Sequence, residues 1–319
     1  MPADKIDVHF HLIPQFFREA VQEAGLMLAT ASYPPWSPGL AFELMDRHGI
    51  AVAITSTAWP GAGFLPAEKA KAFARRCNDY AADLIAQYPK RLGCFGLLPM
   101  HDMEAAIAEA RYCLESLHFE GVGMFASYGE RFLGDAFFDP LMNYLNDCKA
   151  VVHLHPSLHP SSKTLNLRWP GWLVEYVFDT TRAAVNFVFS GARKRFPEIR
   201  IILAHAGGTL PYLALRLELA PLIEASLQSI SRDQILTGLR SFWYDNALAS
   251  GAQTMGALSR VTAREHIIFG SDWPFCDDRV VAEEIARLEA PNFLGKEDVG
   301  GIKFNNALAL FPNRAVAKP

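Results

Sequence analysis

The chain has few cysteines for its length and none of the patterns that make cysteine structural. Five cysteines in 319 residues are scattered, odd in number and without a C-x-x-C pair, which argues against a disulfide framework or a zinc ribbon. No apolar run approaches the roughly 18 residues that span a bilayer, and the first residues lack a secretory signal pattern. The formal net charge of -4 gives no reason to expect nucleic acid or an anionic membrane as a partner. A globular protein of the cytoplasm with reduced thiols is the expectation.

Short apolar runs rich in β-branched and aromatic residues alternate with longer helical patterns along the chain. Most of these runs have no polar face, which is typical of a parallel sheet covered on both sides. We therefore expect an α/β fold, a (β/α)8 TIM barrel forming one domain over residues 1–319. The expected strands are Ile6–His11, Ala51–Thr57, Arg91–Leu98, Gly121–Phe125, Val151–His155, Arg200–His205, Phe242–Asn246 and Ile267–Ser271. The clearest helical patterns cover Pro66–Tyr88, Met103–His118, Pro140–Lys149, Trp172–Phe196 and Asp278–Leu288.

Two long connections interrupt this regular spacing. One, around Gly25–Ser37, is an insertion after the first strand, and the other, Pro156–Gly171, follows the fifth. Loops after barrel strands line the face that carries the active site. An open doubly wound sheet is the alternative fold. It would carry a glycine-rich phosphate turn after the first strand, where the sequence reads HFHLIP over residues 9–14.

Two histidines end the first expected strand. His9 and His11 are two residues apart and point to one face, the barrel interior, where two imidazoles can chelate one ion. By itself such a pair is as consistent with core histidines as with metal ligands. Three further strands end in metal-competent side chains: His155, His205 and Asp272. Because a barrel brings its strand ends together, we expect one divalent metal ion bound by His9, His11, His155 and Asp272.

The fifth expected strand offers a second histidine on the same face. His155 lies at the strand exit, whereas His153 is one layer deeper. We therefore assign the ligand to His155 and regard His153 as a core residue or a support for the ligands.

Several stretches of the chain resemble the amidohydrolase superfamily. The similarity is greatest to the branch of aminocarboxymuconate semialdehyde decarboxylase and the hydroxybenzoate-type decarboxylases, and it runs from the H-x-H strand to NNAL at 305–308. The matching stretches are LMD at 44–46, HP at 155–156, WPGWLV at 169–174, FP at 196–197, AHAGG at 204–208 and GSDWPF at 270–275. A resemblance to 6-methylsalicylate decarboxylases rests on IPQFFREA at 13–20, PWS at 35–37 and WPG at 59–61.

The resemblance implies a mononuclear metal site. The family residues that match the four expected ligands hold one ion, usually zinc and sometimes manganese or magnesium. The histidine that matches His205 activates metal-bound water or positions the substrate. Binuclear relatives carry a carboxylated lysine at the end of strand four, which here reads GVGMF over 121–125. One ion is therefore expected, and three histidines with one carboxylate favour zinc.

The resemblance further implies non-oxidative decarboxylation of a small aromatic acid of the hydroxybenzoate type, such as a 6-methylsalicylate-like compound. Residues 19–46 contain no Arg or Lys; the muconate enzyme holds a second substrate carboxylate with an arginine there, so a monoacid is favoured. In the expected mechanism the metal holds the carboxylate and an ortho hydroxyl, Asp272 carries the proton, and His205 donates to a substrate oxygen. Hydrolysis of an amide or lactone, or a hydration, at the same site is the alternative. A metal-binding barrel without catalysis would leave His205 without a role.

Aromatic side chains and one arginine are the expected substrate contacts. Trp36, Trp169 and Phe275 would wall the pocket and stack on the ring, with ordinary core packing as the alternative for each. Arg216 follows His205 by eleven residues, as does a family arginine that reaches into the neighbouring subunit's site. That match implies a homodimer, and a salt bridge on a helix surface is the alternative for Arg216.

Overall fold

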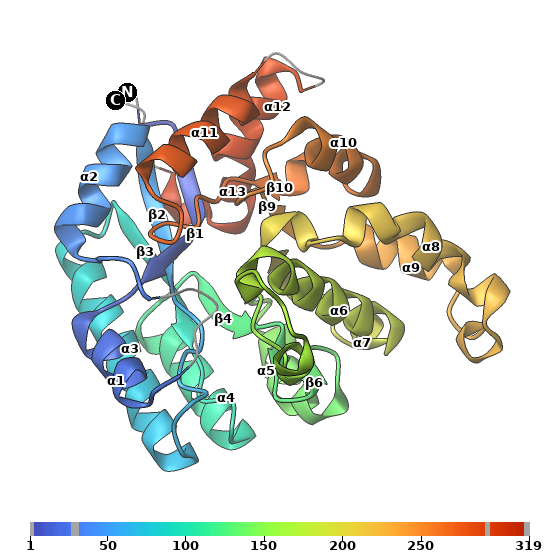
Figure 1. The fold of residues 1–319 in the computed structure, drawn as a ribbon, viewed down its shortest axis with the longest axis horizontal. Coiled ribbons are helices and arrows are strands. Elements are labelled where there is room, and N and C mark those ends of the chain that lie inside the picture. Colours follow the sequence, from blue (N-terminus) through green and yellow to red (C-terminus); the bar gives the residue numbers. More distant parts are fainter. Residues whose placement is uncertain (1–2, 27–31, 291–293, 316–319) are drawn as a thin grey trace.

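A computed structural model describes residues 3–26, 32–290 and 294–315 of the chain. Its main sheet has eight parallel strands in the order β1-β2-β3-β4-β7-β8-β9-β10. The last strand returns to the first, because Phe10 bridges Trp273 and the Val8 amide donates to the Phe269 carbonyl at 3.0 Å. The sheet thus forms a (β/α)8 barrel (Figure 1). Its strands are β1 (Lys5–Leu12), β2 (Ile50–Thr57), β3 (Leu92–Leu97), β4 (Gly121–Phe125), β7 (Val151–His155), β8 (Arg200–Leu203), β9 (Trp243–Asp245) and β10 (Ile267–Ile268).

Helices cover the outside of the barrel (Figure 1). All eight residues of β1 are buried, as expected for strands with a packed interior on one side and helices on the other. A separate hydrophobic cluster joins residues of β1, β2, β3, β7, β8, β9 and β10 to Leu310 and Phe311, and so fills the inside of the barrel. The helices are α1 (Gln15–Glu23), α2 (Pro38–His48), α3 (Ala67–Gln87), α4 (Met103–Arg111), α5 (Asp139–Asp147), α6 (Glu175–Phe189), α7 (Ala192–Arg195), α8 (Leu210–Ile223), α9 (Arg232–Arg240), α10 (Ala252–Val261), α11 (Asp278–Glu289), α12 (Lys296–Gly300) and α13 (Asn306–Leu310).

Some elements differ from the sequence-based expectation. The helical pattern at 172–196 is interrupted, because Gly191 adopts a left-handed φ of 75° between α6 and α7. The helix begun at Met103 ends at Arg111 and continues only as a π turn. A hairpin of β5 (Ser127–Tyr128) and β6 (Arg131–Phe132), not predicted, follows β4. The insertion predicted around 25–37 lies partly outside the described residues, and the one at 156–171 contains a 3-10 turn.

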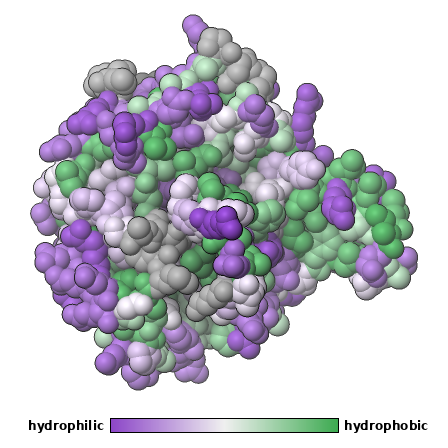
Figure 2. Space-filling view, in the orientation of Figure 1, coloured by the Kyte–Doolittle hydropathy of each residue, from purple (hydrophilic) through white to green (hydrophobic). Residues whose placement is uncertain are grey.

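The arm formed by α8 and α9 projects from the barrel at the right of Figure 1. Four large apolar side chains of α8 are strongly exposed: Tyr212 (87%), Leu215 (63%), Leu222 (68%) and Ile223 (81%). The same arm carries much of the green, hydrophobic surface in Figure 2. Within the described ranges, no helix is both long and apolar enough to cross a membrane.

Candidate metal centre

Strand β1 delivers two buried imidazoles to the carboxyl end of the barrel. The register of β1 against β2 shifts between Asp7 and Phe10, and such irregularities re-aim side chains beside active sites. Beyond this shift His11 pairs with Ser56. The side chains of His9 and His11 are 0% and 1% exposed, respectively, and their ring centroids lie 5.1 Å apart.

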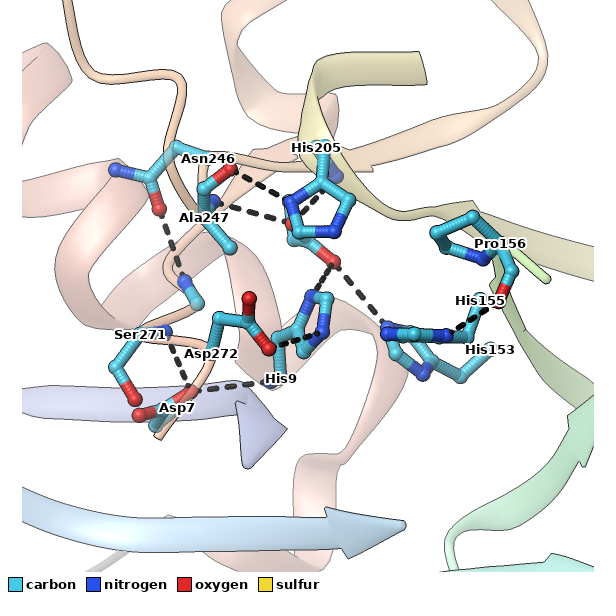
Figure 3. Close-up of polar contacts among 12 residues, drawn as sticks. Asp7, His9, His153, His155, Pro156, His205, Asn246, Ala247, Ser271 and Asp272 are labelled. Carbon is cyan, nitrogen blue, oxygen red and sulfur yellow. Dashed lines mark hydrogen bonds and ion pairs between the residues drawn. The ribbon is translucent and has the colours of Figure 1, made fainter. Parts of the chain in front are cut away.

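Three other strand ends complete the group. His155 is the last residue of β7. The other two residues of the group lie at sharp turns of the backbone after later strands. His205, two residues after the end of β8, and Asp272, four residues after the end of β10, adopt left-handed φ values of 55° and 59°. Such backbone conformations are strained for residues other than glycine and cluster at functional sites. Here they accompany two side chains that lie beside His9 (Figure 3).

Four of these side chains form one compact group. One ligand atom from each of His9, His11, His155 and Asp272 lies within 4.8 Å of the others. The Asp272 Oδ1 atom is 3.3 Å from His9 Nε2 and 3.0 Å from His11 Nε2. Two atoms bound to one ion at about 2.0–2.1 Å lie at most about 4.2 Å apart, so the four side chains would have to move closer together to bind one ion.

A buried carboxylate that the sequence analysis missed contacts two histidine rings, reaching His9 on the side away from Asp272. Asp245 Oδ2 is 3.0 Å from His9 Nδ1 and 3.2 Å from His153 Nε2. Its Oδ1 accepts hydrogen bonds from the backbone amides of His205 at 3.0 Å and Ala247 at 3.1 Å. A charged residue at the end of the apolar strand expected at 242–246 was the available signal. Asp245 therefore positions two rings and the turn that carries a third.

The other histidines are also oriented by single contacts. His155 Nδ1 donates to the Pro156 carbonyl at 2.7 Å, and His205 Nδ1 donates to the Ala247 carbonyl at 3.0 Å (Figure 3). A carbonyl only accepts, so each ring carries its proton on Nδ1 and keeps Nε2 available. His153 lies outside the group of four, stacked on Phe95 at 5.2 Å.

A second buried carboxylate anchors the segment after β7. Asp179 Oδ2 accepts hydrogen bonds from the Ser157 amide at 2.8 Å and the Ser157 hydroxyl at 2.9 Å. Ser127 donates to Asp179 Oδ1 at 3.1 Å. Burial raises the pKa of Asp179 above its usual value. This network ties α6 to the residues that follow His155.

The electrostatics of the group suit a cation. Burial lowers the pKa of His11 and lowers that of His155 well below its usual value, so both rings are neutral, the form that binds metal. Burial opposes charge on His9 too, yet Asp245 and Asp272 together raise its pKa to about 10. Burial also disfavours the Asp272 carboxylate, but His9 and His11 hold its pKa well below the usual range. Two carboxylates around one imidazole are therefore an excess of negative charge that a divalent ion would balance.

An orphaned atom supports the fit. His9 Nε2 is buried and makes no hydrogen bond with any described residue, although it faces Asp272. Unsatisfied buried polar groups are rare in folded proteins and point to an ion or water. The donor set of three imidazoles and one carboxylate matches one divalent metal ion. The cluster supports a mononuclear site.

Of the four residues expected to contact the substrate, one lies at the histidine cluster. The Phe275 ring is 5.0 Å from the His11 ring, at the cluster. Trp36 is buried on the outer side of β1 and β2, in a cavity it shares with Phe10 and Leu12, so the structure does not bring it to the cluster. Trp169 is 47% exposed in the connection after β7. Arg216 is exposed on α8 and forms no ion pair with a described residue.

The closed barrel and the buried histidine–carboxylate group at its carboxyl end define a metal-binding enzyme of the (β/α)8 class. The chain belongs to the amidohydrolase family, whose model matches residues 6–312. It is 36% identical to a decarboxylase of Aspergillus niger, over 97% of this chain and 88% of that protein. It is 34% identical to 6-methylsalicylic acid decarboxylase of Penicillium expansum, over 97% of this chain and 96% of that protein.

Solved structures share the fold over the whole chain. A dihydroxybenzoic acid decarboxylase from Polaromonas, with bound manganese and the inhibitor 2-nitroresorcinol, superimposes with a TM-score of 0.81 at 24% identity and covers 99% of this chain and 98% of that one. The 5-carboxyvanillate decarboxylase of Sphingomonas paucimobilis has a TM-score of 0.82 at 18% identity, with 97% and 99% of the two chains covered.

Proposed function

We propose that the protein is a metal-dependent, non-oxidative decarboxylase of a small aromatic acid of the hydroxybenzoate type, with 6-methylsalicylate-like compounds as the first substrates to test. The observation that carries the proposal is the buried cluster of His9, His11, His155 and Asp272 in a chain whose relatives at 34–36% identity over 97% of its length are decarboxylases. Two of those relatives act on 6-methylsalicylic acid.

The proposed metal ligands are these same four residues. We propose zinc as the ion, because imidazole-rich sites with one carboxylate suit zinc; manganese and magnesium are the alternatives. When bound, the ion would neutralise the substrate carboxylate and hold it in a fixed orientation. Elemental analysis of protein purified from metal-replete medium distinguishes the three metals.

His205 is proposed to bind a substrate oxygen through Nε2. Its Nδ1 is committed to the Ala247 carbonyl and its backbone amide to Asp245, so the ring has one orientation. The His205 ring centroid lies 4.9 Å from that of His9 and 6.0 Å from that of His155. At this position Nε2 can donate a proton to a phenolic or carboxylate oxygen, or accept one.

Asp272 is proposed to carry the proton that replaces the carboxyl group. Its Oδ1 faces the His9 and His11 rings, whereas the hydrogen-bond partner of Oδ2 among the described residues is the Cys276 thiol at 4.0 Å. A carboxyl group with a depressed pKa is a strong acid once protonated, which favours transfer to a weakly basic ring carbon. The proton bonds to the carbon that bears the carboxylate; the electrons of the broken carbon–carbon bond return to the ring, and CO2 leaves.

The test incubates metal-loaded protein with 6-methylsalicylate, 2,6-dihydroxybenzoate and vanillate-type acids and measures CO2 together with the phenolic product. We expect release from at least one acid, abolished in Asp272→Asn and strongly reduced in His205→Gln. If no acid releases CO2 and the protein hydrolyses an aromatic amide or lactone, the decarboxylase proposal is wrong and the site is that of a hydrolase.

We further propose that the enzyme is a homodimer of the cytoplasm. The support for the dimer is the apolar surface of α8, where Tyr212, Leu215 and Ile223 are 63–87% exposed; contiguous apolar surface of this kind marks interaction sites. Arg216 lies on the same helix, and we propose that it reaches into the site of the partner subunit. The cytoplasmic location is proposed from the free cysteines, four of them buried and only Cys148 exposed.

A further inference from the structure

A small cavity lies inside the barrel beside the metal centre. Its lining comes from β2, β3, β4 and β7 and includes Ser56, Phe95, Gly123, His153 and His155. The space in it that a water molecule can reach is about 10 Å³. This is close to the volume of one ordered water, which also needs about two to four polar partners. The cavity therefore has room for one water molecule and for no larger ligand.

Two polar atoms of the lining have no partner in the protein. Ser56 Oγ and His153 Nδ1 are buried and make no hydrogen bond with any described residue. The two residues are 4% and 0% exposed, respectively. They lie on β2 and β7, which β3 and β4 separate in the sheet. Unsatisfied buried polar groups are rare in folded proteins, and two of them around a cavity of this size indicate that one water molecule serves both.

The ring of His153 connects this cavity to the metal centre. His153 Nε2 lies 3.2 Å from Asp245 Oδ2, which also faces His9 Nδ1 at 3.0 Å. A carboxylate can only accept, so His153 donates from Nε2, and in the neutral ring Nδ1 is then an acceptor that needs a donor. Phe95 stacks on this ring with 5.2 Å between the centroids, but its side chain offers no donor. A water O–H group in the cavity would supply one.

We propose that one water molecule is resident in this cavity, where it donates a hydrogen bond to His153 Nδ1 and bonds to Ser56 Oγ. A serine hydroxyl both donates and accepts, so it completes the water in either direction. The water extends the Asp245 network to β2: Ser56 orients the water, the water orients His153, and His153 and Asp245 together orient His9. Ser56 and His153 are thus positioning residues for a proposed metal ligand, whichever reaction the metal serves.

Gly123 leaves the space that the water occupies. It pairs with His153 in the register of β4 and β7. A Cβ atom built on Gly123 would meet nothing closer than 3.8 Å, and its φ is not in the left-handed region. Neither packing nor backbone conformation therefore requires glycine here. In Gly123→Ala the added methyl group should take the place of the water in a folded protein.

High-resolution diffraction from crystals of the metal-loaded protein tests the water directly. We expect one water peak within about 3.2 Å of both Ser56 Oγ and His153 Nδ1, and we expect the peak to be lost in Gly123→Ala. A wild-type cavity without electron density, or a water that does not contact both atoms, would overturn the proposal.

Metal affinity tests the positioning role, by competition with a chromophoric chelator. The Kd of the metal should rise about two- to tenfold in Ser56→Ala and in Gly123→Ala, the effect of one net hydrogen bond. Because both changes remove the same water, the double variant should bind metal no more weakly than either single variant. Gly300→Ala is the matched control, since a Cβ there meets nothing within 4 Å, and its affinity should not change.

Two results would refute the positioning role. One is a set of effects that multiply in the double variant, and the other is a lowered Tm with unchanged metal affinity in the single variants. Neither diffraction nor metal competition depends on the release of CO2, which tests the proposed function separately.

Discussion

Replacing Asp245 with asparagine should weaken metal binding although it changes none of the four proposed ligands. In the native site Asp245 Oδ1 accepts two backbone amides, and Oδ2 faces His9 Nδ1 at 3.0 Å and His153 Nε2 at 3.2 Å. Because a carboxylate only accepts, it holds one His9 proton on Nδ1, so the proton that a bound ion displaces is the one on Nε2. This contact therefore selects the ring tautomer that can bind metal.

The asparagine variant reverses that selection. Its amide oxygen can keep the two backbone amides, which leaves the NH2 group facing His9 and His153. A donor facing His9 Nδ1 favours the ring form protonated on Nε2, the nitrogen that lies 3.3 Å from Asp272. Loss of such a supporting carboxylate lowers metal affinity by about 10–100-fold, which corresponds to about 1.4–2.8 kcal/mol.

The assay is competition for the metal with a chromophoric chelator, run beside thermal unfolding of the metal-free proteins. Glu109→Gln is the matched control: Glu109 is 5% exposed, pairs with Arg75 and Asn78, and touches no histidine of the cluster. It should lose stability and keep its metal affinity. An Asp245→Asn protein that binds metal within about twofold of the wild type would refute the tautomer argument. An equal loss of metal affinity in the two variants would mean that a buried amide weakens binding in general, and that the tautomer of His9 is not the cause.

Three further outcomes are expected. His11→Ala should remove about one equivalent of bound metal per chain by elemental analysis; a wild type that is metal-free after growth in metal-replete medium would contradict the site. Leu215→Asp combined with Ile223→Asp should shift the protein towards monomers in analytical ultracentrifugation, because two exposed apolar side chains of α8 become charged, and an unchanged sedimentation coefficient would exclude α8 as the interface. Burial raises the pKa of Asp179 above 3.8 in the folded protein. As the pH rises, the unfolded chain therefore loses this proton before the folded chain does. The contribution of Asp179 to the free energy of unfolding falls as the pH rises from 3.8 to the raised pKa. Asp179→Asn should therefore flatten the pH dependence of urea unfolding above pH 3.8; a slope equal to that of the wild type would show that Asp179 is ionised in the folded protein.

The strands were predictable because their signal is local. The runs at 121–125 and 151–155 are strands with the same bounds in the structure, since an uninterrupted apolar run between breakers identifies a buried parallel strand. The run expected at 267–271 is paired only over Ile267–Ile268. There the Asn246 side chain accepts the Gly270 amide and the Phe269 carbonyl accepts from Val8, contacts that no local pattern contains.

The proposed ligand types were also in the sequence, because barrel strands that end in histidine or aspartate must present them at one rim. The sequence did not reveal where the aromatic residues lie. Trp36 and Phe275 have similar sequence surroundings, rich in proline and aromatic residues, yet one packs outside β1 and the other lies beside His11. Which side of a strand a loop residue reaches depends on the path of the loop, and that path is set by tertiary packing.

The sequence by itself determined a barrel of alternating strands and helices with a group of imidazoles and a carboxylate at its strand ends, and its resemblance to the family implied one ion. Side-chain alternation and burial act over a few residues, so they are legible without coordinates. Only the tertiary structure decided that Asp245 holds His9, His153 and the His205 turn together, and that the buried Ser56 hydroxyl beside His155 has no hydrogen-bond partner among the described residues. Those facts depend on contacts between residues far apart in the chain, which exist only once the barrel has closed.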